Sequence, residues 1–471
     1  MIVTFTDGTT EIYEDDPFAS GGQGNLYHSR DKRSVVKLYT TPDRLKTERL
    51  KKIITEFNVT RTSPGDSALR RPDHTIKDLF AWPNGISEKP QVGVRMRNVT
   101  YGGDYKPLHW WLSPKLLQKM PDAMRGTWLD RTRVASDMAR IASKLHNSGL
   151  CHSDFSSNNF LANVALQRVV LIDLDSLVVP GVLPPEILGT GDYIAPEIVA
   201  ASFRGDNTAK PSIDADLHSL AVLIYQLLLM RHPLRGPKNY DLNDPSRDDA
   251  LMFGERALYI EDPNDTSNRP AKDFPGAWAL GDEVEGIMRK AFTIGLRTPT
   301  QRPRASEWDE ALLRLFDQII PCSHEACVGK FFVLLRDRPA VCPWCGTAVK
   351  FPQTVPVLRL YRGVGQNGHF QVDKGRIVGW QGRTLHKWHI QADMAERGIL
   401  KEEDKQPFAE VTYTREHGWQ LRNLNISDLR LAEKGTVQPI QVGQPISLEH
   451  GQTLLIGTGG RLAQVTMQGI R

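Results

Sequence analysis

Alternating apolar and polar residues near the N-terminus predict a small β-rich region. Residues 2–5 and 10–13 alternate and are joined by Asp7-Gly8, a dipeptide typical of hairpin turns. Further strands of the same sheet are predicted over the short apolar runs 34–39, 80–83 and 92–96. Within residues 34–39, Lys37 alternates with apolar neighbours, which places a charged side chain on a largely buried strand.

Helical spacing of apolar residues follows this first region. Thr41-Pro42 has the composition of a helix start, and apolar residues then recur at helical spacing at Leu50, Ile53, Ile54 and Phe57. The polar segment 60–75 is predicted to be a loop. Longer helices are predicted over 128–148, which ends before Gly149, over the apolar run 217–230, and over 307–320.

From residue 355 onward helical spacing is replaced by short alternating runs between Gly and Asn turns, which predicts a β-sandwich. The chain has 471 residues, which at about 150 residues per domain suggests about three domains. The pattern therefore predicts a mixed region first and an all-β region last.

Composition narrows the possible partners and location. The formal charge of +4 is small for this length and no basic block is present, so we expect no nucleic-acid or membrane partner. No signal peptide is expected at the start, and the run 217–230 is too short to span a bilayer. Four of the five cysteines lie between Cys322 and Cys345, which indicates metal binding in a reducing, cytoplasmic environment.

The stretch 150–177 carries the clearest chemistry. It contains Asp154 and Asn159, five residues apart, and Asp173 after a further apolar strand. An acid, an amide and a second acid at these distances can accept a hydroxyl proton and hold Mg²⁺ on a nucleotide phosphate. The glycine-rich turn at 21–24 precedes Lys37 at a distance suited to phosphate binding.

These features, taken in order, resemble the eukaryotic-like protein kinases over roughly residues 1–318. Gly189 to Glu197, which reads GTGDYIAPE, is similar to the end of an activation segment. Asp216 matches the aspartate that steadies the catalytic loop in that family, and Arg302 matches the arginine that pairs with the glutamate of Ala-Pro-Glu. The resemblance implies an α+β, two-lobed protein-kinase fold, with a small lobe over 1–99 and a large lobe over 100–318.

The resemblance also implies roles for individual residues. Asp154 would accept the proton of the substrate hydroxyl, and Asn159 and Asp173 would hold Mg²⁺. Lys37 would bind the phosphates of ATP, and the hinge at Met96 would meet adenine. The expected nucleotide contacts are Gly21, Gly22, Gly24, Leu26, Lys37 and Met96. Such an enzyme is expected to act on a protein substrate as a serine/threonine kinase.

Several positions depart from the family pattern. Ser153 replaces the arginine that receives an activation-loop phosphate, Ser156 replaces a phosphate-contacting lysine, and Asp175 replaces the glycine of Asp-Phe-Gly. The partner of Lys37 on the first helix stays open between Glu48 and Glu56. The alternatives are a catalytically weak pseudokinase scaffold that binds nucleotide and partners, and a small-molecule kinase. In detail the lobe resembles bacterial kinases found with a von Willebrand-type A protein and a metal-dependent phosphatase.

The cysteine cluster predicts a zinc ribbon over 319–352. The ligands expected for Zn²⁺ are Cys322, Cys327, Cys342 and Cys345. The Cys-x-x-Cys-Gly turn points two thiolates at one ion, and the first pair supplies the other two. A strand is predicted over 331–335, His324 could replace one cysteine, and the ribbon is expected to space the last domain from the large lobe.

The last region, 353–471, resembles the forkhead-associated domain in its β-pattern and in a few positions. Such domains bind phosphothreonine through an Arg, a Ser and an Asn; here Arg376 and His389 match the pattern. His386 stands at the Ser position and Asp428 at the Asn position, where it would repel phosphate. The region is therefore predicted to be a forkhead-associated-like sandwich, used either for phosphopeptides or for protein docking and intramolecular contact.

Overall fold

The structure is a computed structural model of the chain, and it describes most of its residues. The described ranges are 1–42, 44–61, 75–179, 189–206, 208–271, 274–364, 369–391, 402–456 and 460–470. Asp43 and most of the predicted loop at 60–75 lie outside these ranges. Within them, no helix has both the length and the apolar character needed to cross a membrane.

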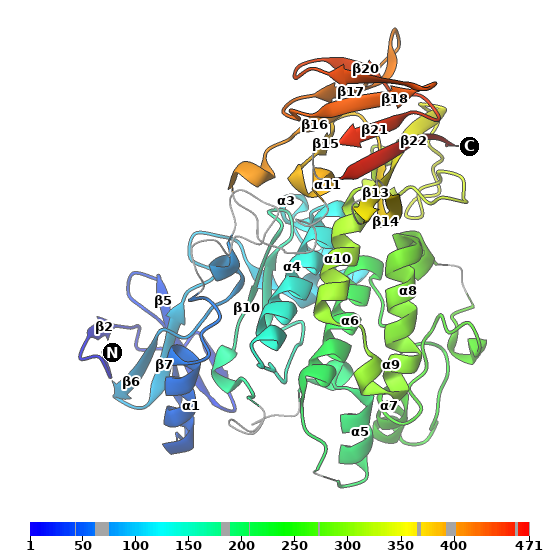
Figure 1. The fold of residues 1–471 in the computed structure, drawn as a ribbon. Coiled ribbons are helices and arrows are strands. Elements are labelled where there is room, and N and C mark those ends of the chain that lie inside the picture. The colour runs from blue at the N-terminus through cyan, green and yellow to red at the C-terminus, as the bar shows by residue number, and fades with distance from the viewer. Residues whose placement is uncertain are drawn as a thin grey trace.

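Among the described residues, the small lobe contains a seven-stranded sheet and one α-helix, drawn in blue in Figure 1. The strands are β1 (Ile2–Phe5), β2 (Thr10–Ile12), β3 (Ala19–Gly21), β4 (Gly24–His28), β5 (Ser34–Tyr39), β6 (Gly85–Lys89) and β7 (Gly93–Arg97). Their order is β2-β1-β6-β7-β5-β4-β3, so β5, which carries Lys37, lies between β7 and β4. Helix α1 (Arg44–Thr55) buries Leu50 against this sheet, whereas its Ile53 packs into the apolar core of the large lobe.

The expected strand over 80–83 is absent. The chain instead forms the 3-10 helix η1 (Ile76–Leu79), and Phe80 makes a single parallel bridge to Leu171 of the large lobe. Trp82 donates from its indole nitrogen to the carbonyl of Ile53, and Pro83 has no N–H to contribute to a ladder. These residues therefore pack under α1 and leave the sheet. The strand predicted at 80–83 is replaced by β6, which begins at Gly85.

The large lobe is built on four long helices that lie side by side in Figure 1. They are α4 (Trp128–Asn147), α6 (Ile213–Leu229), α8 (Gly281–Phe292) and α10 (Ala305–Phe316). Thr127 caps α4 by accepting from the Asp130 amide, and Ser212 caps α6 by accepting from the Ala215 amide. Almost every residue of α6 is buried, so it forms the centre of the lobe, as the apolar run 217–230 predicts.

Shorter elements complete this lobe around the long helices. The strands are β8 (Lys106–Pro107), β9 (Phe160–Asn163) and β10 (Arg168–Leu171). The α-helices are α2 (Pro114–Gln118), α3 (Asp122–Arg125), α5 (Pro196–Phe203), α7 (Pro245–Phe253) and α9 (Ile294–Arg297). The 3-10 helices are η2 (Leu108–Trp111), η3 (Leu174–Ser176), η4 (Gly191–Tyr193), η5 (Thr266–Asn268), η6 (Ala277–Leu280) and η7 (Pro299–Gln301).

The predicted helix over 307–320 ends earlier than expected. Helix α10 stops at Phe316, and Ile319–Pro321 forms strand β11, which pairs with β12 (Phe331–Val333). Ile319 and Ile320 are β-branched and are buried on opposite sides of this two-stranded ribbon, one against the large lobe and one against the C-terminal sheets. Their burial favours a strand where apolar spacing alone suggests another helical turn.

Two antiparallel sheets follow, drawn from yellow to red in Figure 1. One has the order β14-β13-β22-β21-β18-β19 and contains β13 (Thr354–Val364), β14 (His369–Val378), β18 (Leu429–Glu433), β19 (Thr436–Ile440), β21 (Thr453–Ile456) and β22 (Arg461–Gly469). The other has the order β15-β16-β17-β20 and contains β15 (Arg383–Leu385), β16 (Ala409–Thr414), β17 (Gly418–Asn423) and β20 (Pro445–Ser447). Helices α11 (Lys387–Ile390) and η8 (Glu402–Lys405) lie between β15 and β16 in sequence. Both sheets contribute to one apolar core.

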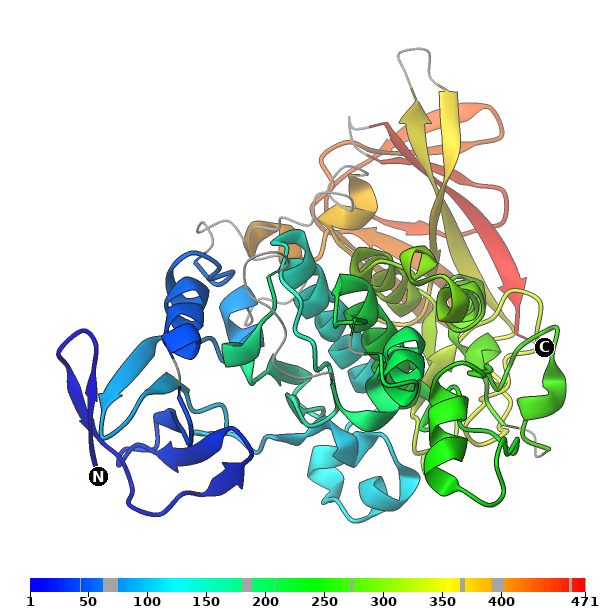
Figure 2. The ribbon, with the colours of Figure 1, turned by 90° about the horizontal axis from the view of Figure 1, so that it is seen from below.

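The ribbon does not hold the C-terminal sheets away from the large lobe, contrary to the expectation of a spacer. Arg383 donates to the carbonyls of Phe316 and Ile319, at 2.8 and 2.5 Å, and the Val378 amide donates to Asp317 at 2.7 Å. These bonds join the end of α10 directly to the first strands of the sheets. Figure 2 shows the small lobe and the C-terminal sheets on different sides of the large lobe.

Candidate active site

The loop between α4 and β9 carries the predicted acid and amide, and hydrogen bonds hold its backbone. Asp216, buried at the start of α6, accepts from the amide of His152 at 2.7 Å and from that of Ser153 at 3.1 Å. Ser153 has φ of 66°, a left-handed conformation that these two bonds stabilise. The backbone of Cys151 pairs with that of Val178, which connects the loop to the segment that follows Asp175.

Asp154 and Asn159 are in direct contact. The Asn159 side-chain nitrogen donates to Asp154 Oδ2 at 2.8 Å and to the Asp154 carbonyl at 2.9 Å. Asp154 Oδ1 is buried and has no hydrogen-bond partner among the described residues. A buried carboxylate oxygen without a partner is costly, so this atom points to a ligand that donates a proton.

Lys37 reaches across from the small lobe to the second acid. Its Nζ lies 2.7 Å from Asp173 Oδ1 and 3.1 Å from Asp175 Oδ2, and the lysine side chain is buried. The Ile172 amide donates to the Asn159 carbonyl at 2.9 Å, which places Asp173 directly beyond the Asp154–Asn159 pair. The structure thus brings together all four residues expected to carry the chemistry.

The electrostatics of these groups differ from one another. Burial alone would lower the pKa of Lys37, but Asp175 and Asp173 outweigh it and raise that pKa. Burial raises the pKa of Asp173, and the neighbouring Asp175 carboxylate acts in the same direction. Lys37 is therefore charged, and the close carboxylate pair makes Asp173 the group that gains most from a bound cation.

The glycine-rich turn lies over Lys37, with one glycine explained by packing. A Cβ on Gly24 would come within 2.3 Å of the Leu38 carbonyl, so β4 and β5 need glycine there. Gly21 and Gly22 have open space beside them, and Gln23 Oε1 accepts from Lys37 Nζ at 3.1 Å. Leu26 lies opposite Lys37 in the β4–β5 register.

Met96 lies on β7 and its side chain is packed in the core of the small lobe, with Val35 opposite it in the sheet. The expected hinge therefore begins after Arg97, where β7 ends. Because the Met96 side chain is buried, a contact with a nucleotide base at this position would have to be made by its backbone.

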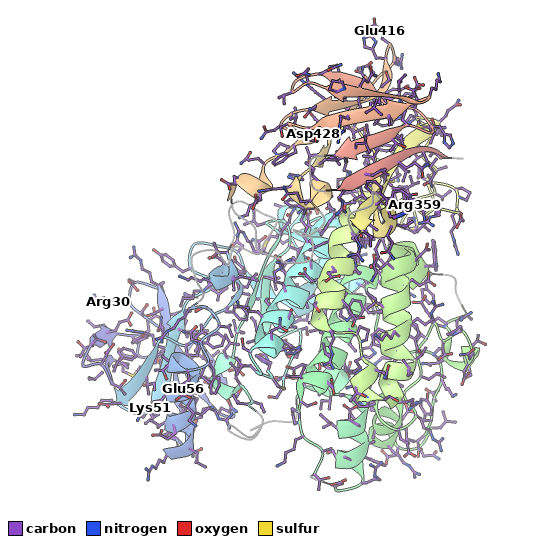
Figure 3. The ribbon with its side chains drawn as sticks, viewed as in Figure 1. Arg30, Lys51, Glu56, Arg359, Glu416 and Asp428 are labelled. Carbon is purple, nitrogen blue, oxygen red and sulfur yellow. The ribbon has the colours of Figure 1, made fainter. Side chains whose placement is uncertain are left out.

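Neither candidate glutamate on the first helix reaches Lys37. Glu48 is exposed and lies 3.4 Å from Lys51, and Glu56 is exposed just beyond the end of α1. Figure 3 labels Lys51 and Glu56 at the outer part of this helix. The helix instead turns two cations, Lys46 and Arg49, toward the large lobe.

Sequence reasoning missed Lys46 and Arg49, although a signal was present. Both lie on the helical face of Leu50 and Ile53, at the spacing that predicts burial. A cation on a buried face requires a carboxylate or carbonyl partner, and here Asp175 and the Leu177 carbonyl supply it.

The segment from Gly189 to Glu197 lies beside the loop, as expected. Asp154 and Thr190 line the same small pocket, and Ser219 of α6 donates to the Tyr193 carbonyl at 2.7 Å. Arg302 makes a two-pronged ion pair with Glu197, with its nitrogens 2.9 and 2.7 Å from the carboxylate oxygens. The pairing expected from the sequence is therefore present.

Comparison with known proteins agrees with this arrangement. Residues 124–305 match the family model described as protein kinase domain. This part of the chain is therefore similar to protein kinase domains. The matched part includes Asp154, Asn159, Asp173, Glu197 and Asp216, whereas Lys37 and the glycine-rich turn precede it.

Curated relatives of the kinase domain are serine/threonine-protein kinases. PknD of Chlamydia abortus is 30% identical over 247 residues, which are 46% of this chain and 24% of that protein. PknL of Mycobacterium tuberculosis is 29% identical over 185 residues, which are 36% of this chain and 43% of that protein. The chain therefore spans less than half the length of these relatives.

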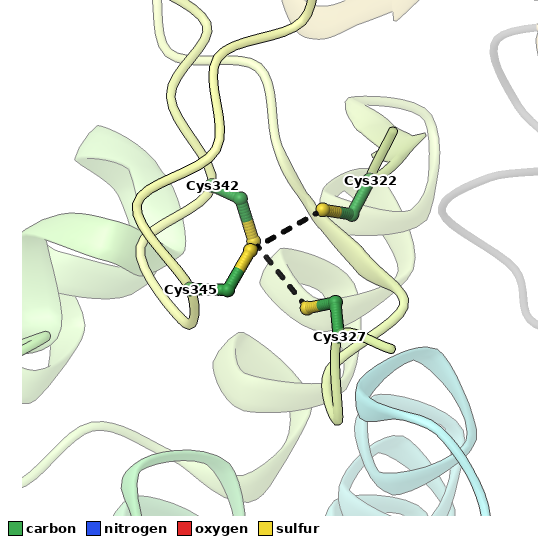
Figure 4. A group of neighbouring side chains, drawn as sticks. All are labelled: Cys322, Cys327, Cys342 and Cys345. Carbon is green, nitrogen blue, oxygen red and sulfur yellow. Dashed lines mark hydrogen bonds between the residues drawn. The ribbon is translucent and has the colours of Figure 1, made fainter. Parts of the chain in front are cut away.

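The four cysteines predicted to bind zinc converge, as Figure 4 shows. Their sulfur atoms all lie within 4.8 Å of one another. The Sγ atoms of Cys322 and Cys345 are 3.6 Å apart, and those of Cys327 and Cys342 are 3.7 Å apart. These distances are too long for disulfides, and they fit the spacing of about 3.8 Å between thiolates on a tetrahedral ion with Zn–S bonds of about 2.3 Å.

The residues predicted to read phosphothreonine are engaged within the molecule. Arg376 is buried and donates to the Leu334 carbonyl and to Gln468, at 3.3 and 2.8 Å. His389 is also buried and lies 3.1 Å from Asp317 at the end of α10, while Asp428 pairs with Arg430 at 3.2 Å. The His389–Asp317 contact joins the sheets to the large lobe, and Arg376 joins them to the ribbon, whereas the Asp428–Arg430 pair lies within the sheets.

Proposed function

We propose that this chain is a serine/threonine protein kinase that transfers the γ-phosphate of ATP to a hydroxyl group of a protein substrate. The observation that carries the proposal is the convergence of Lys37, Asp173, Asn159 and Asp154 at the junction of the two lobes. The match of residues 124–305 to the protein kinase domain and the names of the relatives support the same activity.

Each residue has a distinct task in this mechanism. Lys37 and the turn with Gly21, Gly22, Gly24 and Leu26 hold the phosphates, and the backbone near Met96 meets the base. Asp154 Oδ1, which has no partner among the described residues, accepts the proton of the substrate hydroxyl. The hydroxyl oxygen then bonds to the γ-phosphorus as the bond from that phosphorus to the β–γ bridging oxygen breaks, and ADP leaves with that oxygen.

The residues present fit a magnesium ion. Mg²⁺ prefers oxygen ligands, and the Asp173 carboxylate and the Asn159 amide oxygen supply them. The Asn159 side-chain nitrogen donates two hydrogen bonds, both to Asp154, which leaves the side-chain oxygen for the ion. When bound with ATP, the ion neutralises phosphate charge; positioning and proton transfer remain the work of the protein side chains.

The substrate class rests on the segment from Gly189 to Glu197. Arg302 holds the end of this segment through Glu197, and the segment borders Asp154. A segment held in place beside the catalytic base Asp154 can bind a peptide substrate, whereas the alternative of a small-molecule kinase assigns no function to this segment. Thr190 is the residue that the family resemblance connects with serine and threonine acceptors.

The remaining parts of the chain have proposed roles of their own. Residues 319–352 would bind one Zn²⁺ through the four cysteines, as a ribbon, and residues 353–471 would form a forkhead-associated-like docking unit fixed to the large lobe. A cytoplasmic location, and partnership with a von Willebrand-type A protein and a metal-dependent phosphatase, are proposed from the reducing-compartment cysteines and the resemblance alone.

Transfer of labelled phosphate from ATP tests the proposal. The full chain is incubated with Mg²⁺, ATP and a casein acceptor, and compared with Asp154→Ala and Lys37→Met. Loss of the base or of the phosphate-binding charge is expected to lower incorporation by at least about 100-fold. Equal incorporation in all three proteins would refute the kinase assignment. Nucleotide binding without transfer in the wild-type protein would support the alternative of a pseudokinase scaffold, which Ser153 and Ser156 favour.

A further inference from the structure

The lysine that binds phosphates in a protein kinase is ordinarily held by a glutamate from the small-lobe helix. In this chain, the carboxylates described within ion-pair distance of Lys37 are Asp173 and Asp175, both on the large lobe. Glu48 lies next to Lys51 instead. The positioning of Lys37 therefore depends on a different set of residues.

Asp175 has the features of a structural anion. It is fully buried, and Tyr39 donates its hydroxyl to Oδ2 at 2.6 Å. Lys37 and Lys46 lie 3.1 and 3.4 Å from the same oxygen, and Lys37 also donates to Oδ1 at 3.3 Å. Both oxygens are therefore engaged by protein groups, which argues against Asp175 as a second metal ligand.

The Asp175 carboxylate is thus shared between Lys37 on β5 and Lys46 on α1. The small lobe supplies both lysines, and the large lobe supplies the acid.

Helix α1 reaches the large lobe with positive charge. Lys46 Nζ donates to the Asp175 carbonyl at 3.3 Å and lies 4.8 Å from the centre of the Tyr39 ring, a cation–π distance. Arg49 donates to the Leu177 carbonyl at 2.8 Å. Two buried cations therefore attach the helix to the backbone on both sides of Ser176.

We propose that Asp175 replaces the helix glutamate as the partner of the phosphate-binding lysine, and that Lys46 is the positioning residue that holds Asp175 and α1 together. The charges are reversed relative to the usual arrangement: the carboxylate comes from the loop after the metal-binding acid and the helix supplies a cation. The aspartate at the glycine position of Asp-Phe-Gly thus compensates for the lack of a helix glutamate at Lys37. This inference rests on the proposed kinase function.

Kinetics with respect to ATP test the inference. Lys46→Met and Asp175→Asn are each expected to lower kcat/KM for ATP by about 10- to 100-fold, the usual cost of losing a partner that orients a functional group. Lys46→Arg keeps a cation, although the guanidinium is larger and planar, and is expected to lose less than Lys46→Met and to stay within about fivefold of wild type. KM for the acceptor protein should not change, because these groups face the phosphates and not Asp154.

Glu48→Gln and Lys51→Met are the matched controls on the same helix and should leave kcat/KM within about twofold, since both side chains are exposed. The double variant Lys46→Met/Asp175→Asn should be no more than about threefold worse than Asp175→Asn alone, because the two residues act as one unit. Unfolding midpoints of every variant are measured alongside, so that loss of the fold is separated from loss of positioning.

The inference is overturned if Glu48→Gln or Glu56→Gln costs as much as Asp175→Asn, or if Lys46→Met keeps full kcat/KM. A fluorescent ATP analogue, titrated with Mg²⁺ present, gives a second readout that needs no phosphate transfer. Weaker nucleotide binding in Lys46→Met but not in Lys46→Arg would support the inference even if the wild-type protein transferred no phosphate. Equal nucleotide affinity in all variants would overturn it.

Discussion

Arg302 donates two hydrogen bonds, of 2.9 and 2.7 Å, to the carboxylate of Glu197, although the two residues are 105 positions apart in the sequence. The same guanidinium donates to the carbonyls of Asp214 and Gly295, at 2.7 and 2.9 Å. Arg302 is 2% exposed, so these partners take the place of water around its guanidinium. The pair fixes the end of the segment that borders Asp154.

Replacing Arg302 by methionine is expected to destabilise the protein by about 2 to 3 kcal/mol. Removing one member of a buried ion pair costs about 3 to 5 kcal/mol, and the part-exposed Glu197 reduces that figure because water can solvate it. Urea unfolding of the full chain measures the change. Arg304→Met is the control, since Arg304 is exposed and its pairing with Asp214 contributes about 0.5 kcal/mol or less. Equal stability of the two variants would contradict the assigned role.

The Arg302–Glu197 pair was predicted from the family resemblance, and other contacts of the site were predicted from residues that lie close together in the sequence. Asp154, Asn159 and Asp173 follow one another on a short loop and strand, so their convergence is a local property. The partner of Lys37 was not predicted, because it depends on how α1 lies against the large lobe. The presence of Lys46 on the apolar face of the helix would have indicated this arrangement only if Asp175 had been recognised as its partner.

Tertiary packing also decided the regions where prediction was wrong. Residues 80–83 read as a strand, but Trp82 bonds to the α1 carbonyl of Ile53 and leaves the sheet. Ile319 reads as helical, but burial between the ribbon and the large lobe makes it a strand residue. In both places contacts with residues distant in sequence decide the local structure, and such contacts cannot be predicted from the spacing of apolar residues.

Removal of zinc is expected to loosen the large lobe as well as the ribbon. Trp344, beside Cys345, packs against Trp128 with ring centres 5.5 Å apart and the ring planes tilted by 39°, and its indole nitrogen donates to the Phe331 carbonyl at 2.9 Å. Its ring covers Gly329, where a Cβ would lie 2.2 Å away, and the Gly329 carbonyl accepts from the Trp128 amide. Since Trp128 begins α4, the ribbon is attached to the helix that leads into the catalytic loop.

A strong chelator should therefore release about one zinc per chain, change tryptophan fluorescence and lower the unfolding midpoint by several degrees. Cys345→Ser should show the same lower midpoint without chelator. Cys151→Ala is the control for thiol content, since Cys151 is buried far along the chain from the cluster and should leave the zinc content unchanged. A purified protein with much less than one zinc per chain would refute the site.

Acidification should lower the free energy of unfolding through His232, whose buried side chain contacts the segment that contains Asp192. Its Nε2 lies 3.1 Å from the Asp192 carbonyl, and the Leu234 amide donates to its Nδ1 at 3.1 Å. This arrangement holds a neutral ring with the proton on Nε2, because Nδ1 must accept. Burial lowers the pKa of His232 to about 4.

In the unfolded chain this histidine takes up a proton near pH 6.5, so between about pH 6.5 and 4 the unfolded state binds more protons than the folded state. Stability contributed by the neutral ring is thus complete above pH 6.5 and is lost as the pH falls, by up to about 1.4 kcal/mol per pH unit. Urea unfolding of wild type and His232→Asn at a series of pH values measures this slope. The asparagine can still accept from Leu234 but does not titrate, so the variant should be less stable at pH 7 and should lose less stability on acidification. His417→Asn, at an exposed position, should keep the wild-type slope. An unchanged slope in His232→Asn would show that other groups, and not this ring, cause the acid sensitivity.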